Sequence, residues 1–231
     1  MMIIWFVLVG CSSNTKEEQA SEEFEAITSG QVNNQFQKSE IENMIKQLPA
    51  PADLPFYFQS SGAKFNESLL NPLEKIATYK TVSEKAAINL GVYAVDIAYV
   101  RSYAQTQVAL SYMAESRILS DHINATSAFE AQLLREVEDN IENKETLAII
   151  LNNAVENTYI FLRNNDRLPT SILVLTGGFI EGLHLSTGII NSEISSNNVN
   201  NKEVINDISA KTVEMEMEVT NLINLLKSLE E

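Results

Sequence analysis

Apolar residues recur at spacings of three and four along most of the chain, and this period is typical of helices that bury one face. A sustained alternation of apolar and polar residues, which would indicate strands, occurs nowhere. The clearest helix lies near the C-terminus, where two heptad series predict a bundle seam. The first series is Ile208, Met215, Leu222 and Leu229, and the second is Thr212, Val219 and Leu226. We therefore expect an all-α fold, a helical bundle of about five to seven helices.

The stretch 81–122 is expected to form the centre of this bundle, because it contains no proline and one glycine, Gly91. Thr81 and Glu84 have the spacing of a capping box, which predicts the start of a helix. The polar run 102–107 leaves two forms open, one long helix or two helices with a break between them. The apolar face consists of Ala86, Leu90, Tyr93, Ile97, Val100 and Ala104.

Proline and glycine predict where the other helices begin and end. Pro169 is expected to start a long helix that runs through Ile190. Because each glycine weakens a helix by about 1 kcal/mol relative to alanine, the glycines in this segment indicate close helix packing or a local kink. They are Gly177, Gly178, Gly182 and Gly188. Shorter helices are predicted over 41–48, 54–61, 72–79, 127–141 and 147–162, and the Asn-rich run 197–201 is predicted as a loop.

The N-terminus has the pattern of a targeting signal. Residues 1–9 are wholly apolar, but a helix needs about 20 residues to span a bilayer, so the segment is typical of a secretory signal. Leu8-Val9-Gly10-Cys11 resembles the lipobox of bacterial lipoproteins, although no Lys or Arg precedes the apolar run. That resemblance implies cleavage before Cys11 and attachment of lipid to it. Two or three lipid chains anchor a protein stably where one does not.

We therefore expect three parts in the chain. They are a signal peptide (1–10), a lipidated cysteine with a disordered tether (11–38) and a single helical-bundle domain (39–231). The tether is rich in Ser, Asn, Gln and Glu, which is typical of disorder. Ser12 after the cysteine resembles the choice that sorts lipoproteins to the outer membrane. The expected location is the cell envelope, facing the periplasm or the cell surface.

The formal net charge of −15 excludes some partners. Such a surface repels phosphate backbones, so we expect no nucleic-acid partner. It also repels anionic lipid headgroups, which leaves the lipid on Cys11 as the expected contact with the membrane. Cys11 is the only cysteine, so no disulfide can form within the chain. The sequence contains no Gly-rich phosphate loop and no Cys-His cluster, and we expect no cofactor and no bound metal.

Short segments rich in proline, glycine and tyrosine occur between 49 and 96. They are Pro49-Ala50-Pro51, Ser61-Gly62-Ala63-Lys64-Phe65, Leu70-Asn71-Pro72, Tyr79-Lys80-Thr81, and Asn89-Leu90-Gly91-Val92-Tyr93 with Asp96. Together they resemble a family of uncharacterised helical lipoproteins of Gram-negative bacteria, with Ala94 where that family usually has a second glycine. The resemblance covers 39–125 well and the C-terminal half loosely. It implies the helical fold and the envelope location, and it brings no assigned activity.

Asp96 lies among apolar residues in the central stretch, where a buried carboxylate is costly unless it is paired or hydrogen-bonded. Arg101 is a poor direct partner, because it lies about 140° around the helix. We favour an interhelix hydrogen bond that fixes the register of the bundle. The alternative is an acid that faces a ligand.

Glu181 and His184 have a spacing that places both side chains on one helix face. Di-iron bundles use this Glu-x-x-His motif twice, and its single occurrence here disfavours such a site. A mononuclear site with Asp96 stays open, while a partly buried helix pair is favoured. The central stretch also concentrates tyrosines, for which core filling is favoured over a pocket wall. They are Tyr93, Tyr99, Tyr103 and Tyr112.

Two hypotheses for the function follow. The favoured one is a lipid-anchored helical protein without enzymatic activity that binds a partner protein or a small ligand. The other is a metal-dependent or hydrolytic enzyme with a site around Asp96, Glu181 and His184. No residue is assigned a catalytic role. The residues expected to face a ligand are Tyr93, Asp96, Tyr99, Glu181 and His184.

Overall fold

The computed structural model describes residues 51–125, 167–196 and 201–227, together with scattered positions within 43–48 and 136–149. All elements in these ranges are helical, and no strand occurs among them. The predicted all-α class is therefore confirmed. The predicted signal and tether (1–38) and most of two predicted helices (127–162) lie outside the described residues.

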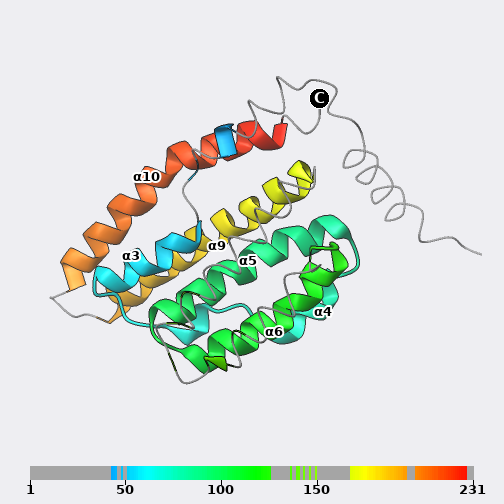
Figure 1. Cartoon of the computed structure of the whole chain (residues 1–231). Helices are drawn as coiled ribbons and strands as arrows, with labels where there is room; N and C mark the ends of the chain where they lie inside the picture. The colour runs from blue at the N-terminus through cyan, green and yellow to red at the C-terminus, as the bar shows by residue number, and fades with distance from the viewer. Residues whose placement is uncertain are drawn as a thin grey trace, which may run out of the picture.

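Four long helices form the body of the described part (Figure 1). α5 (Ser83–Ser102) and α9 (Leu168–Ser195) lie side by side at its centre and make the most extensive contact between described elements. α6 (Thr106–His122) packs on α5, and α10 (Lys202–Lys227) packs on α9. The central pair therefore carries one long helix on each of its two members.

Short elements precede α5 in the sequence and pack around the long helices. η1 (Pro51–Asp53) and α3 (Leu54–Ser60) contact both α5 and α9. η2 (Glu67–Leu69) contacts α9, and η3 (Leu73–Lys75) leads into α4 (Ile76–Tyr79), which packs on α6. Among the long helices outside the central pair, these short elements contact α6 through α4 and α10 through α3.

Helices α5 and α9 touch backbone to backbone. A Cβ added to Gly91 would overlap the carbonyl oxygen of Val174, and a Cβ added to Gly177 would overlap the carbonyl oxygen of Ile88. Each helix thus lays a glycine against the main chain of the other, and the contact is reciprocal. Of the two interpretations of the glycines in α9, close helix packing is the one observed here. The approach requires residues that lack a side chain.

The central stretch is two helices rather than one. α5 ends at Ser102, Ala104 adopts a left-handed backbone with φ 57°, and α6 begins at Thr106. The amide of Gln105 donates to the carbonyl oxygen of Val100 at 2.9 Å and closes the turn. The break that was one of two forms expected for 102–107 is therefore present, and it lets α6 fold back on α5.

The capping box predicted at the start of α5 is wrong. Val82 is the N-cap, with φ −140° and ψ 136°, and no side chain caps the helix. Its carbonyl oxygen accepts a helical hydrogen bond from the Ala86 amide at 3.0 Å. Thr81 therefore lies before the cap, too early in the chain for its hydroxyl to bond the amide of Glu84.

Buried side chains form two main clusters. The larger lies between α3, α9 and α10 and includes Phe58, Phe179 and Ile208. The second lies between α4, α5 and α6 and includes Tyr93 and Leu119. Because α5 and α9 contribute to both sides, their close contact holds the two clusters together.

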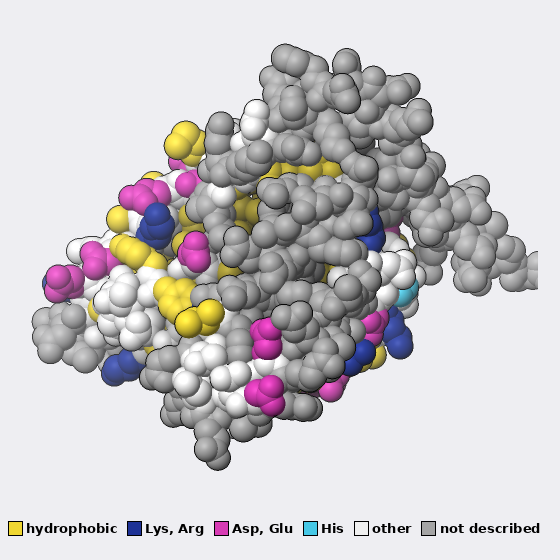
Figure 2. All heavy atoms as spheres, viewed as in Figure 1, with side chains coloured by type: hydrophobic (Ala, Val, Ile, Leu, Met, Phe, Trp, Pro, Cys, Tyr) yellow, Lys and Arg dark blue, Asp and Glu magenta, His cyan; other side chains and the backbone are white. Residues whose placement is uncertain are grey.

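Acidic side chains are dispersed on the face drawn in Figure 2. Asp and Glu side chains (magenta) of the described residues are scattered there, with Lys and Arg (dark blue) among them, and do not gather in a single patch.

Helix α9 is long and apolar enough to cross a membrane by length and composition alone. However, 56% of its most apolar window is buried inside the protein. A core helix of a bundle passes the same test, because it is apolar on nearly all sides. Its position against α5 and α10 accounts for its composition.

Helix α10 joins the bundle through the predicted seam. Ile208, Met215 and Leu222 are 0%, 3% and 5% exposed. The first heptad series is thus confirmed as far as the described residues reach, with Leu229 outside them, whereas Thr212, Val219 and Leu226 of the second series are only partly buried. Leu225 adds a further buried position near the end of the helix.

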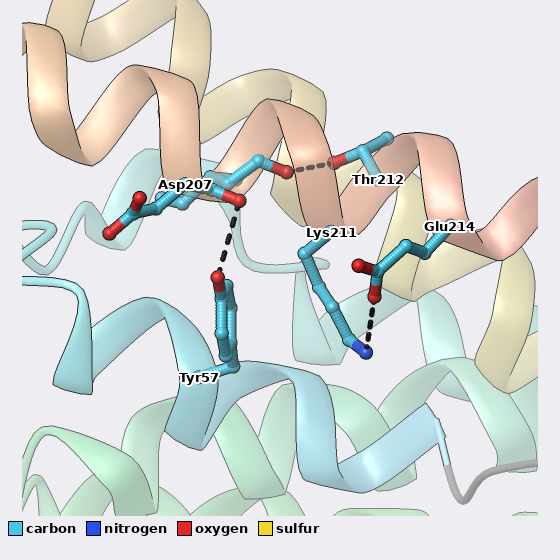
Figure 3. A network of polar contacts seen from close by, with 6 residues as sticks. Tyr57, Asp207, Lys211, Thr212 and Glu214 are labelled. Carbon is cyan, nitrogen blue, oxygen red and sulfur yellow. Dashed lines mark hydrogen bonds and ion pairs between the residues drawn. The ribbon is translucent and has the colours of Figure 1, made fainter.

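Polar contacts join α10 to α3 (Figure 3). The Tyr57 hydroxyl donates to the carbonyl oxygen of Asp207 at 3.3 Å. The Lys211 ammonium lies 6.0 Å from the centre of the Tyr57 ring and 3.0 Å from Glu214 Oε2. The Lys211–Glu214 ion pair is solvent-exposed and therefore adds little stability, whereas the Tyr57 ring is partly buried against the larger cluster.

The glycine contact gives the first test. Gly177→Ala should lower the free energy of unfolding by about 2–3 kcal/mol, because the new methyl group meets backbone that cannot rotate away. Chemical denaturation of the full-length chain measures the change. Gly188→Ala is the matched control in the same helix, since its Cβ meets only the side chain of Leu69. Equal losses in the two variants would contradict the backbone contact.

Candidate functional site

Three segments bring polar groups together inside the bundle. α5 supplies Asp96, α9 supplies Glu181, and the connection between η2 and η3 supplies Asn71. Asp96 is 0% exposed and Glu181 is 3% exposed. Both carboxyls lie about one turn beyond the glycine contact, so the crossing of the two helices sets their separation. We call Asp96, Glu181 and Asn71 the carboxyl bridge.

Asn71 joins the two carboxyls with a single side-chain amide. Its Nδ2 donates to Asp96 Oδ2 at 3.0 Å and to Glu181 Oε2 at 2.9 Å. Its backbone amide donates to Asp96 Oδ2 at 3.3 Å. The two hydrogens of one NH₂ group therefore tie a residue of α5 to a residue of α9.

Local sequence explains why Asn71 is available for this role. It precedes Pro72, and a residue in that position is pushed away from helical backbone conformations. Leu70 before it and Pro72 after it are both extended. The backbone groups of Asn71 are consequently free of helical hydrogen bonds and can bond to the core.

Tyrosines hold the Asn71 segment against the central pair. The Tyr112 hydroxyl donates to the Asn71 carbonyl oxygen at 2.7 Å, and the Tyr93 hydroxyl donates to the Pro72 carbonyl oxygen at 2.8 Å. The Tyr99 hydroxyl accepts from the Asn66 amide at 2.9 Å. These side chains are therefore core residues whose polar ends hold one connecting segment in place.

The surroundings of the carboxyl bridge favour neutral forms. Burial raises the pKa of Asp96 well above its usual value, and the charge of Glu181 raises it further, while the Asn71 donors lower it. Burial also raises the pKa of Glu181, against lowering by Asn71 and by His184. Burial raises the pKa of Tyr112 to about 12, so this phenol stays protonated. Asp96 is the group of the pair in which the neutral form is favoured more strongly.

His184 lies at the edge of this site. It is exposed, and its Nε2 is 3.1 Å from the carbonyl oxygen of Leu69. Glu181 faces the interior, so the Glu-x-x-His pair spans the boundary between core and solvent. Within the described ranges, no three His, Cys, Asp or Glu side chains are placed to hold a metal ion together.

The structure brings together some of the residues that the sequence singled out. Asp96 and Glu181 meet at one amide, while Tyr93 and Tyr99 bond to the connecting segment and His184 stays at the surface. That any of these five residues faces a ligand stays a prediction. The lipidation prediction for Cys11 lies outside the described residues.

Sequence reasoning missed Asn71 and Tyr112 as members of the site. The signal for Asn71 was its position before Pro72, which was interpreted only as the start of a helix. The hydrogen bond expected for Asp96 exists, but its donor is Asn71 in a connecting segment, and the same amide group also bonds Glu181 of α9.

No protein-family model matches the chain, and comparison with curated proteins and with solved structures finds no significant similarity.

Removing the amide of Asn71 should destabilise the fold. Asn71→Ala leaves two buried carboxyls without their donors, and an unsatisfied buried group costs about 1–3 kcal/mol. We expect a loss of about 2–4 kcal/mol in the free energy of unfolding, measured by denaturation of the full-length chain. Asn89→Ala is the control, because Asn89 bonds only to Lys85 of its own helix at an exposed position. A loss as small as that of the control would show that the bridge contributes nothing.

Proposed function

We propose that the protein is a lipid-anchored component of the bacterial cell envelope whose helical domain binds a partner protein or a small ligand and catalyses no reaction. The observation that carries the anchor is the segment Leu8-Val9-Gly10-Cys11, which has the residue types of a lipobox at the end of an apolar run. Lipid on Cys11 holds the chain to the membrane, and the segment 11–38 gives the domain reach. Ser12 favours the outer membrane, with the domain in the periplasm or at the cell surface.

The absence of catalysis is supported by the position of the acidic groups. A general acid or base must lie within hydrogen-bond reach of the substrate. Asp96 and Glu181 are instead buried and bonded to Asn71. Asp96 and Glu181 are thus interior residues, and we expect a partner or ligand to bind at the surface of the bundle.

The charge supports a lipid anchor over an electrostatic one. A chain with a net charge of −15 is repelled by anionic headgroups and by nucleic acid. Buried acyl chains contribute about 0.8 kcal/mol per CH₂ group and are indifferent to this repulsion. The expected partners are therefore proteins or small molecules that reach the domain from the aqueous side.

The anchor is tested at the cysteine. Cys11→Ser should abolish incorporation of labelled palmitate and leave the signal segment uncleaved, because no other thiol is present in the chain. Metabolic labelling and the mobility of the product on a gel measure both effects. Ser12→Ala is the matched control and should be labelled and cleaved normally. Normal labelling of Cys11→Ser would refute the lipid anchor.

Metal analysis tests the proposal that the domain is not a metalloenzyme. Full-length protein purified without a histidine tag should contain far less than one equivalent of transition metal. The physical reason is that Asn71 bonds both carboxyls, while His184 points to the surface. Stoichiometric metal that is lost in Asp96→Ala and His184→Ala would instead support an enzyme centred on these residues.

A further inference from the structure

Two oxygens of the carboxyl bridge have no donor. Asp96 Oδ1 and Glu181 Oε1 are inaccessible to solvent, and neither accepts a hydrogen bond from an N–H or O–H group of the described chain. The two carboxyls are nevertheless neighbours, because a single nitrogen, Asn71 Nδ2, donates to Asp96 Oδ2 at 3.0 Å and to Glu181 Oε2 at 2.9 Å. Two carboxylate oxygens are both acceptors, so they can bond only through a hydrogen that lies between them.

We propose that Asp96 and Glu181 hold one proton between them, and that this buried proton-binding site couples the stability of the α5–α9 contact to pH. The proton comes from solvent and forms an O–H bond on Asp96. That hydroxyl donates to Glu181, so both orphaned oxygens gain a partner. The pair then carries a single negative charge. This inference concerns the bundle alone and does not depend on the lipid anchor.

The donors around the pair indicate one proton rather than none. Asn71 supplies three N–H contacts, two to Asp96 Oδ2 and one to Glu181 Oε2. Three neutral donors are too few for two buried negative charges, whose like-charge repulsion raises the proton affinity of the pair. The pKa directions agree, since burial raises the pKa of both carboxyls and Glu181 raises that of Asp96 further.

The same donors indicate one proton rather than two. Asn71 Nδ2 donates to Glu181 Oε2 at 2.9 Å, and a hydrogen bond to a carboxylate favours its charged form. His184 on the same helix also lowers the pKa of Glu181. The remaining charge is therefore placed on Glu181, next to the only basic group that acts on the pair among the described residues.

The other titratable groups around the pair are phenols and acids. Besides burial, Asp96 raises the pKa of three tyrosines, which are Tyr93 and Tyr99 from α5 and Tyr112 from α6. Beyond them, Tyr79 from α4 acts on Tyr93, and Glu67 from η2 and Glu74 from η3 act on Tyr112. Among the described residues, His184 is therefore the only basic group that lowers the pKa of either carboxyl.

The direction of the pH effect follows from proton counting. Unfolded Asp and Glu lose their protons near pH 4. The folded pair keeps one proton above that pH, so the native state binds more protons than the unfolded state. Stability must then fall as pH rises from about 5 to the pKa of the pair, by a factor of about 10 in the unfolding constant per pH unit.

Asp96→Asn tests this dependence, because it keeps the shape and offers a permanent N–H in place of the shared proton. The unfolding constant of the full-length chain in urea is measured between about pH 5 and 7. The ratio of wild type to variant should rise about tenfold per pH unit. For Asp121→Asn, a carboxylate that is 52% exposed beside Arg117, the ratio should stay constant. A constant ratio for Asp96→Asn would overturn the proposal.

A spectroscopic measurement decides the matter even where the variant fails to fold. At pH 7 the infrared spectrum of the folded wild-type chain should contain the carbonyl band of one protonated carboxylic acid. Unfolding at the same pH should remove that band, since the proton is then released. Asp96→Asn should lack it as well, because the O–H bond of the shared proton lies on Asp96. A native spectrum at pH 7 without the band would refute the shared proton.

Discussion

The reciprocal contact of Gly91 and Gly177 with the opposite backbone determines how closely α5 and α9, the two central helices, approach each other. Each glycine faces a carbonyl oxygen of the partner helix rather than a side chain. A substitution on one helix therefore has no counterpart on the other that could make room for it. This constraint brings α5 and α9 close enough for Asp96 and Glu181 to share one amide. The glycine contact determines the distance between the two helices, and at that distance the Asn71 amide can bond both carboxyls.

Around α5 and α9, backbone groups of one connecting segment form hydrogen bonds with side chains of the helices. The connecting segment 66–72 donates amides inward, and the hydroxyls of Tyr93 and Tyr112 bond its carbonyl oxygens. This connecting segment, whose only helical turn is η2, is thereby held in place by side chains from α5 and α6. Buried polar groups that are satisfied in this way specify one arrangement of the core, whereas an unsatisfied group would favour none. Asn71 takes part in both kinds of contact, because its N–H groups donate to the buried carboxyls and its carbonyl oxygen accepts from Tyr112.

Much of the fold could be predicted from the sequence, because helices follow from local patterns. The heptads of α10 depend on residues within a few turns, whereas the sequence left open both a break in 102–107 and close packing or a kink at the glycines of α9, and the contact of two distant helices decided the second of these. The capping box predicted at Thr81 was wrong because Val82, with its extended backbone, is the residue that precedes the first turn of the helix. The sequence indicated Asp96 because it lies among apolar residues, and Glu181 because His184 follows it at the spacing of one helix turn. Their common partner could not be predicted, since it depends on how two helices cross far apart in the chain.

The arrangement of the two hydrophobic clusters also bears on how the molecule opens. The buried residues of α10 belong to the larger cluster, and its principal contact among the described helices is α9. Proteins open in cooperative units whose cost follows the contacts that they break. Detachment of α10 would expose one side of that cluster while the glycine crossing and the second cluster stayed closed. Helix α10 can therefore open locally while the rest of the described bundle stays folded. Backbone amides of α10 should then exchange their hydrogens with solvent faster than the amides of α5 and α9.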